Sequence, residues 1–201
     1  MKHLFKEGSN PSKPTLLLLH GTGGNEQDLL PLAQMIDPES SVLSVRGNIL
    51  ENGMPRFFKR LAEGVFDEQN LKEETKNLAD FIDEAAITYG FDRSNVIAVG
   101  YSNGANIAGS LLFRYPNVLK GAILHHPMVP VRGLSLPDLK ELPVFIGAGE
   151  NDPICPPEES KELKVLLEEA GAEVEIDWGQ SGHSLTQSEL EAARKWYMKK
   201  F

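Results

Sequence analysis

One pentapeptide constrains the fold of this chain more than any other stretch. Residues 100–104 read GYSNG, the apolar run 96–99 stands directly before them, and apolar residues at helical spacing follow over 105–112. The arrangement predicts a buried strand that turns sharply into a helix, with Ser102 at the apex of the turn. The two glycines are expected where strand and helix approach too closely for any side chain. Such a turn holds the serine hydroxyl out of both elements, where it is available for chemistry.

Short apolar runs alternate with amphipathic patterns along the whole chain. This order predicts an α/β fold with a mainly parallel sheet and helices on both faces. An edge strand around Leu4 and Phe5 completes the expected elements. The predicted strands cover 15–19, 42–45, 96–99, 122–125, 144–148 and 174–178, and the predicted helices cover 28–36, 71–89, 105–115, 158–170 and a last one that begins at Thr186 with a capping box to Glu189.

Two connections between the predicted elements bear on the shape of a binding site. The stretch 46–67 reads as irregular, and a connection of that length often has a function. We expect Phe57 and Phe58 within it to line a substrate pocket, although a flap that packs its aromatic side chains into the core is an equally good interpretation. The stretch 126–143 is too short for an inserted helical lid.

The composition is that of an acidic globular protein. Lysine and arginine total 20 against 29 aspartate and glutamate residues, so the formal net charge is −9. No basic stripe is present, and we therefore expect neither nucleic acid nor stable membrane insertion. The single cysteine, Cys155, excludes an intrachain disulfide and a cysteine-based zinc cluster. These features predict one domain over residues 1–201 in the cytoplasm, with a homodimer left open.

Three residue types that could act together follow three of the predicted strands. The carboxyl ends of parallel strands meet at one edge of a sheet, and function gathers there. Ser102, Asp152 and His183 all lie in such loops. A serine hydroxyl needs a base to take its proton, and the base needs an anion that fixes its tautomer. The order serine, aspartate, histidine is the one known for α/β-hydrolases.

Other residues compete for the same roles. His20, His125 and His126 are alternative bases, but all three precede the acid, and His20 adjoins a glycine-rich loop where a structural hydrogen bond is the commoner role. We expect His126 to contact substrate, and burial against a neighbour is the better interpretation for at least one of His125 and His126. Glu150 and Asp177 are alternative acids. Cys155 is expected to be a small buried thiol.

Four motifs together resemble the α/β-hydrolase superfamily. They are LHGTGG at 19–24, GYSNG at 100–104, GENDPI at 149–154 and SGH at 181–183. More narrowly they are similar to its small lidless branch of carboxylesterases, lysophospholipases and acyl-protein thioesterases. The resemblance covers nearly the whole chain and implies a three-layer α/β-hydrolase fold without a cap domain.

The resemblance also implies roles for single residues. Ser102 matches the nucleophile of the family, Asp152 the acid and His183 the base, while the backbone N–H groups of Thr22 and Asn103 match the oxyanion hole. Two departures are local, because many relatives have glutamine in place of Asn103 and an apolar residue in place of Thr22. Since the donors are backbone groups, these departures affect substrate preference more than mechanism.

The expected function is that of a serine carboxylesterase acting on small carboxylic esters. Thioesterase or lysophospholipase activity is a variant of the same chemistry. A dienelactone-hydrolase-like enzyme that opens a cyclic ester is a second alternative, although such relatives usually carry cysteine where this chain has Ser102. A catalytically silent receptor for small molecules is a third. None of the enzymatic alternatives requires a metal or an organic cofactor, and the expected partner is a small-molecule ester.

Overall fold

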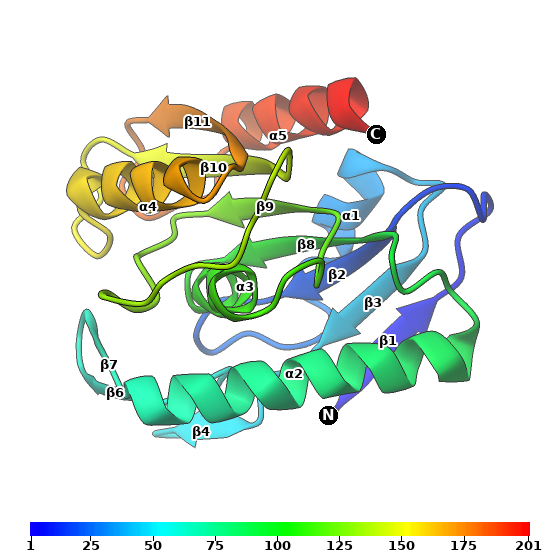
Figure 1. The fold of residues 1–201 in the computed structure, drawn as a ribbon, viewed down its shortest axis with the longest axis horizontal. Coiled ribbons are helices and arrows are strands. Elements are labelled where there is room, and N and C mark those ends of the chain that lie inside the picture. Colours follow the sequence, from blue (N-terminus) through cyan, green and yellow to red (C-terminus); the bar gives the residue numbers. More distant parts are fainter.

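A seven-stranded sheet forms the centre of the molecule in the computed structural model, which describes residues 1–201 (Figure 1). The strand order is β1-β3-β2-β8-β9-β10-β11, and every neighbouring pair is parallel except β1 with β3. The predicted edge strand at Leu4 and Phe5 is therefore confirmed as β1. The strands of this sheet are β1 (His3–Lys6), β2 (Thr15–Leu19), β3 (Val42–Val45), β8 (Val96–Tyr101), β9 (Gly121–His125), β10 (Pro143–Gly149) and β11 (Glu173–Gly179).

Helices cover both faces of this sheet, as the alternating pattern predicts. Side chains of α2, α3 and α4 belong to the larger of two buried apolar clusters, and those of α1 and α5 belong to the smaller one on the opposite face. In Figure 1, α3 is seen end-on, with α2 and α4 on either side of it. The helices are α1 (Leu30–Ile36), α2 (Glu68–Tyr89), α3 (Asn103–Arg114), α4 (Pro157–Glu169) and α5 (Gln187–Lys200).

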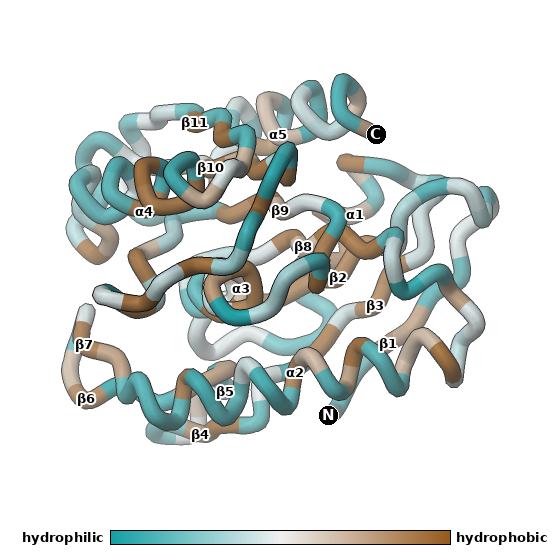
Figure 2. The backbone as a smooth tube through the Cα atoms, in the orientation of Figure 1, coloured by the Kyte–Doolittle hydropathy of each residue, from teal (hydrophilic) through white to brown (hydrophobic).

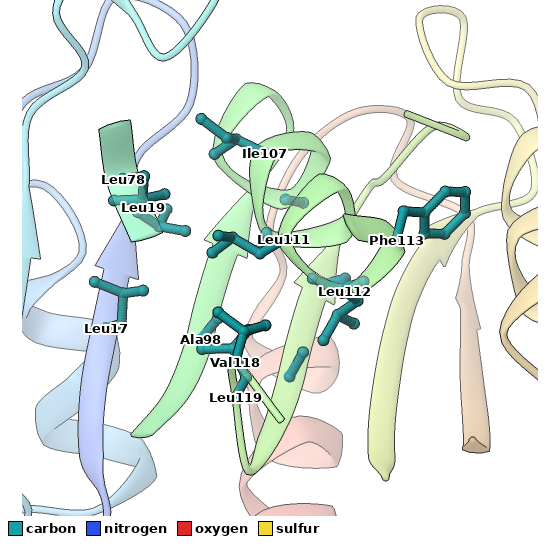
Figure 3. Close-up of a cluster of buried hydrophobic side chains, with 14 of the residues drawn as sticks. Leu17, Leu19, Leu78, Ala98, Ile107, Leu111, Leu112, Phe113, Val118 and Leu119 are labelled. Carbon is teal, nitrogen blue, oxygen red and sulfur yellow. The ribbon is translucent and has the colours of Figure 1, made fainter. Parts of the chain in front are cut away.

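The central strands are buried on both faces, which explains why they read as continuous apolar runs. In β2, Leu17 and Leu19 point into the larger cluster, while Leu16 and Leu18 point into the smaller one. Figure 3 shows Leu17 and Leu19 on the same side of the sheet as the α3 residue Leu111. Hydrophobic segments accordingly follow the central strands and α3, whereas α2 alternates between hydrophobic and hydrophilic turns (Figure 2).

The stretch 46–67 is more regular than predicted. It forms two small antiparallel hairpins, β4 (Ile49–Glu51) with β5 (Met54–Arg56) and β6 (Arg60–Ala62) with β7 (Val65–Phe66). These strands have only two or three residues each, so they are too short for a period-two pattern to be visible in the sequence. Phe57 and Phe58 lie between the hairpins and are fully buried in the larger cluster.

The connection between β9 and β10 contains no helix and no strand over 126–142, which agrees with the prediction that no cap domain is inserted there. Every helix of the structure is too short or too polar to cross a lipid bilayer. The loops that follow β2, β8, β9, β10 and β11 leave the sheet at the carboxyl ends of parallel strands. They bring residues far apart in the sequence to one edge of the sheet.

Candidate active site

Ser102 stands at a sharp turn between β8 and α3 with φ of 51°, a backbone conformation that residues other than glycine rarely adopt. Close packing around it requires both flanking glycines. A Cβ atom on Gly104 would lie 1.9 Å from the backbone oxygen of Leu19, and one on Gly100 would lie 2.7 Å from the backbone of Ala105. The predicted strand, turn and helix are therefore present, with the serine at the apex.

The structure brings Ser102, His183 and Asp152 together in one chain of hydrogen bonds. His183 Nε2 lies 2.8 Å from Ser102 Oγ, and His183 Nδ1 lies 2.7 Å from Asp152 Oδ2. Because a carboxylate only accepts hydrogen bonds, His183 carries its proton on Nδ1 and presents the free Nε2 lone pair to the serine hydroxyl. This is the arrangement in which imidazole can take the serine proton.

Asp152 is buried and held as an anion. Its Oδ1 accepts hydrogen bonds from the backbone N–H groups of Ile154 at 2.8 Å and Cys155 at 2.9 Å. Burial alone would raise the pKa of this carboxyl group, but the backbone donors and the two histidines His183 and His126 lower the pKa below its ordinary value. Asp152 therefore stays charged at neutral pH while facing His183.

Tyr101 supports the histidine loop and was not among the predicted site residues. Its hydroxyl donates a hydrogen bond of 2.5 Å to the backbone oxygen of His183, and its ring centroid lies 5.6 Å from the imidazole. Burial raises the pKa of this phenol, so it remains a donor. A tyrosine next to the serine was visible in the sequence, but its partner lies 82 positions further along the chain.

The two groups predicted to form an oxyanion hole lie on the same pocket as Ser102 and His183. Thr22 follows β2, and its backbone N–H takes part in none of the backbone hydrogen bonds of the turns and loops. Asn103 is the first residue of α3, where a backbone N–H has no acceptor within the helix. The Asn103 side chain holds the backbone of the hairpin segment in place, because its Oδ1 accepts a hydrogen bond from the Phe57 N–H at 2.7 Å.

A pocket of about 300 Å³ opens beside Ser102. The two hairpins supply part of its wall, with Arg56 from β5, Arg60 from β6 and Phe66 from β7. Arg56 is buried and paired with Glu51 at 3.1 Å, and Arg60 donates to the same carboxylate at 2.9 Å. The other hydrophobic residues that line it are Tyr101, Met128, Ile154 and Cys155. The stretch 46–67 thus forms a pocket wall and also packs aromatic rings into the core, so both interpretations of it hold in part.

Three residues predicted to contact substrate do not line this pocket. Phe57, Phe58 and His126 have at most 2% of their surface exposed. Phe57 packs at a tilt against His20 with a centroid distance of 4.8 Å, and Phe58 packs edge-on against Phe66 at 5.0 Å. Their prediction as substrate-binding residues is wrong, because the neighbouring arginines and Phe66 occupy the pocket side of the hairpins. His126 lies behind Asp152 instead.

The competing candidates for base and acid have other surroundings. His20 is buried, donates from Nδ1 to the Gly21 backbone oxygen at 2.6 Å and accepts from the Gly47 N–H at Nε2, 3.1 Å away. Burial lowers its pKa, so it is a neutral structural residue. Glu150 is exposed and binds Gln180, and Asp177 lies within β11. Cys155 is buried as expected, and its thiol donates to the His126 backbone oxygen.

One group of side chains has the composition of a metal site. Donor atoms of His126, Asp152 and His183 lie within 4.8 Å of one another. The sequence alone does not reveal this cluster, because His126 and His183 are far apart in it. Every ring nitrogen in the group already lies within hydrogen-bond distance of a protein oxygen, and the two histidines share Asp152 Oδ2. These side chains therefore form a network of hydrogen bonds with one another.

Known proteins resemble this chain over its whole length. The family model described as Phospholipase/Carboxylesterase matches residues 3–200. A crystal structure of a carboxylesterase from Bacillus cereus superposes with a TM-score of 0.99 at 65% identity, covering 100% of this chain and 95% of that one. The Bacillus subtilis (strain 168) protein named "Putative hydrolase MhqD" is 63% identical over 98% of both chains.

More distant relatives extend the comparison. Acyl-protein thioesterase 1 of Cryptococcus neoformans is 25% identical over 77% of this chain and 72% of its own length. The family model spans the serine turn and the loops that carry Asp152 and His183, and the resemblance predicted from the four motifs is confirmed. This chain belongs to the phospholipase/carboxylesterase family of α/β-hydrolases.

Proposed function

We propose that this protein is a serine carboxylesterase that hydrolyses small carboxylic esters through an acyl-enzyme on Ser102. The observation that carries the proposal is the hydrogen-bonded chain from Ser102 through His183 to Asp152, at the wall of an open pocket. Membership of the phospholipase/carboxylesterase family and the similarity to the Bacillus cereus carboxylesterase support it.

The reaction proceeds by acyl transfer in two steps. Ser102 Oγ attacks the ester carbonyl while His183 Nε2 takes the hydroxyl proton, and Asp152 stabilises the imidazolium that forms. The backbone N–H groups of Thr22 and Asn103 bind the developing oxyanion. His183 then returns its proton to the departing alcohol. Water, activated by the same imidazole, attacks the acyl-enzyme and releases the acid.

The pocket favours small substrates over lipid-like ones. Its volume of about 300 Å³ is at the lower end of small-molecule sites, which leaves little room for a long alkyl chain. Two arginines and a glutamate, Arg56, Arg60 and Glu63, occupy the wall where a long alkyl chain would need apolar contacts. The relationship to acyl-protein thioesterase 1 keeps a thioesterase as the alternative.

We expect short acyl chains to react fastest. With p-nitrophenyl esters of graded chain length, kcat/KM for acetate or butyrate exceeds that for palmitate by at least about tenfold, a difference of 1.4 kcal/mol in transition-state binding. Assays below the critical micelle concentration of the long ester isolate the effect of the pocket. Fastest turnover of palmitate would assign the protein to the lysophospholipase variant, and a preference for a butyryl thioester over the matched oxygen ester would assign it to the thioesterases.

The single cysteine of this chain does not suit the lactone-opening alternative. Relatives that open dienelactones use a cysteine nucleophile, whereas the only thiol here is buried with 4% of its surface exposed. Burial also raises the pKa of Cys155, which disfavours the reactive thiolate.

We assign the enzyme to the cytoplasm, where a reduced, buried cysteine is the usual state. Its expected partner is a small-molecule ester.

A further inference from the structure

A second layer of charged side chains lies behind the acid Asp152. His126 Nδ1 is 2.8 Å from Asp152 Oδ2, and His126 Nε2 is 3.2 Å from Glu189 Oε2. Glu189 Oε1 in turn lies 2.5 Å from His125 Nδ1. All four residues are buried, with at most 6% of their surface exposed. They extend the chain of hydrogen bonds from Ser102 through the interior to α5.

The fold makes specific room for this layer. A Cβ atom on Gly147, in the middle of β10, would lie 2.1 Å from Glu189 Oε1 and 2.9 Å from His125 Nδ1. His126 has φ of 52°, a left-handed conformation that turns its ring away from the line of β9. Glu189 was predicted to close a capping box on Thr186. The Thr186 hydroxyl does accept the Glu189 N–H at 3.2 Å, but the Glu189 carboxylate turns inward to the histidines.

The hydrogen-bond partners determine the charge of His126. A carboxylate accepts hydrogen bonds and donates none, and each nitrogen of this ring faces a carboxylate oxygen. Both nitrogens must therefore carry a proton, which makes the ring an imidazolium. Burial would lower the pKa of His126, but Glu189 and Asp152 raise it above the ordinary value. The pKa of Glu189 is lowered to about 2, with the hydrogen bonds from both histidines outweighing its burial.

His125 differs from its neighbour in this respect. Its Nδ1 faces Glu189, but its Nε2 is buried without a hydrogen-bond partner. A protonated Nε2 there would be a buried charged donor without an acceptor, which is strongly unfavourable. His125 is therefore the neutral ring with its proton on Nδ1, and the single positive charge of this pair of histidines lies on His126.

We propose that His126 is a permanently protonated positioning residue that shares Asp152 with His183 and moderates how strongly Asp152 stabilises the charged form of His183. The two rings have centroids 5.1 Å apart and donate to the same oxygen, Asp152 Oδ2. The positive charge on His126 opposes the positive charge that His183 acquires when it accepts the serine proton. No proton leaves His126 during the reaction, because the Ser102 proton goes to His183 Nε2.

No other titratable group that faces His126 carries a positive charge before His183 is protonated. Glu189 of α5 and Asp152 after β10 are the two anions that it bridges. Tyr101 of β8 and Cys155 face the same site, and both have a pKa raised by burial, so both are neutral at the pH of the assay. Burial and the nearby Glu189 raise the pKa of Asp177 of β11 from its ordinary value. The charge of His126 is thus the one positive charge adjacent to Asp152 before His183 is protonated.

The test compares His126→Asn with His125→Asn. Asparagine tolerates the left-handed backbone, and its Nδ2 can replace Nδ1 as a neutral donor to Asp152. H126N therefore removes the charge and the hydrogen bond to Glu189 but keeps a donor to Asp152. The kinetic readout rests on the proposed function. We expect the acidic limb of kcat/KM against pH to move up by about one pH unit in H126N, the usual size for loss of a like charge at this distance. H125N, which loses a neutral ring, leaves the limb in place. An unshifted limb in a folded, active H126N variant overturns the proposal.

A second measurement does not depend on catalysis or on a variant that folds. In ¹⁵N-histidine NMR of the wild-type protein at about pH 8, well above the ordinary range of histidine, both ring nitrogens of His126 show the shifts of protonated nitrogens. His125 shows one protonated and one unprotonated nitrogen. H126N provides the assignment, by loss of its signals. An unprotonated ring nitrogen on His126 refutes the proposal even if the esterase activity is confirmed, and the absence of esterase activity leaves this measurement valid.

Discussion

Replacing Ser102 by alanine lowers kcat/KM for p-nitrophenyl butyrate by a factor on the order of 10⁴ or more. The reason is that no other group can form the acyl-enzyme. Tyr101 donates its hydroxyl to the His183 backbone oxygen, and the Cys155 thiol is buried and donates to the His126 backbone oxygen. Only the residual effect of substrate binding and the oxyanion donors remains in the variant. Initial rates under saturating and limiting substrate measure the loss.

The fold of this variant is expected to be intact. Ser102 contributes one side-chain hydrogen bond, to His183 Nε2, and its strained backbone is held by the tight packing around Gly100 and Gly104. We therefore expect the melting temperature to change by less than about 3 °C, which corresponds to roughly 1 kcal/mol for a chain of this size. If S102A retains more than about a tenth of the wild-type rate, Ser102 is not the nucleophile.

Asp152→Asn is expected to lower kcat by about 10³ to 10⁴, although it changes one atom. Asp152 Oδ1 accepts two backbone N–H groups, so the amide oxygen of asparagine takes that position. The amide NH₂ then faces Nδ1 of His183 and of His126, whose hydrogen bonds Oδ2 of the acid accepts in the wild type. The imidazole must take its other tautomer, with the proton on Nε2 pointing at Ser102. A ring in that state cannot accept the serine proton.

The measurement for this variant includes a matched control. Glu150→Gln removes an exposed carboxylate two positions away and is expected to leave kcat within about twofold of the wild type. Because the wrong tautomer is the cause in D152N, the loss appears in kcat and persists at all pH values at which the fold is stable. Activity of D152N close to that of E150Q would mean that Asp152 does not orient the base.

The fold was predictable because its signals are local. The strands β2, β8, β9 and β10 are buried on both faces, so each reads as an unbroken apolar run, and the 22 residues of α2 repeat a helical pattern up to its left-handed terminal Gly90. The hairpins within 46–67 were missed because each strand has two or three residues. Strands of that length are defined by their neighbours and not by a pattern of their own.

The candidate site was predictable where a residue occupies a strand end. Ser102, Asp152 and His183 each follow a strand of the parallel sheet, and the topology alone brings such loops together. The direction in which a side chain points was not predictable in this way. Phe57 and Phe58 point into the core while Arg56 lines the pocket, and nothing in their sequence separates the two directions.

Glu189 shows the same limitation more clearly. Its position three residues after Thr186 is the signal of a capping box, and half of that box does form. The carboxylate nevertheless turns to His125 and His126, because the space above Gly147 admits it and two buried imidazoles face it there. The local pattern could not reveal this competition, because the histidines lie at and just after the end of β9, more than 60 residues earlier.

The most direct test of Ser102 as the activated nucleophile is covalent labelling of the native enzyme by a fluorophosphonate ester, followed by peptide mass spectrometry. The reagent reacts with a serine only when a neighbouring base has activated it. We expect a single adduct on Ser102, formed in step with the loss of esterase activity and absent from S102A. Complete inhibition with the adduct on another residue, or full activity without any adduct, would contradict it.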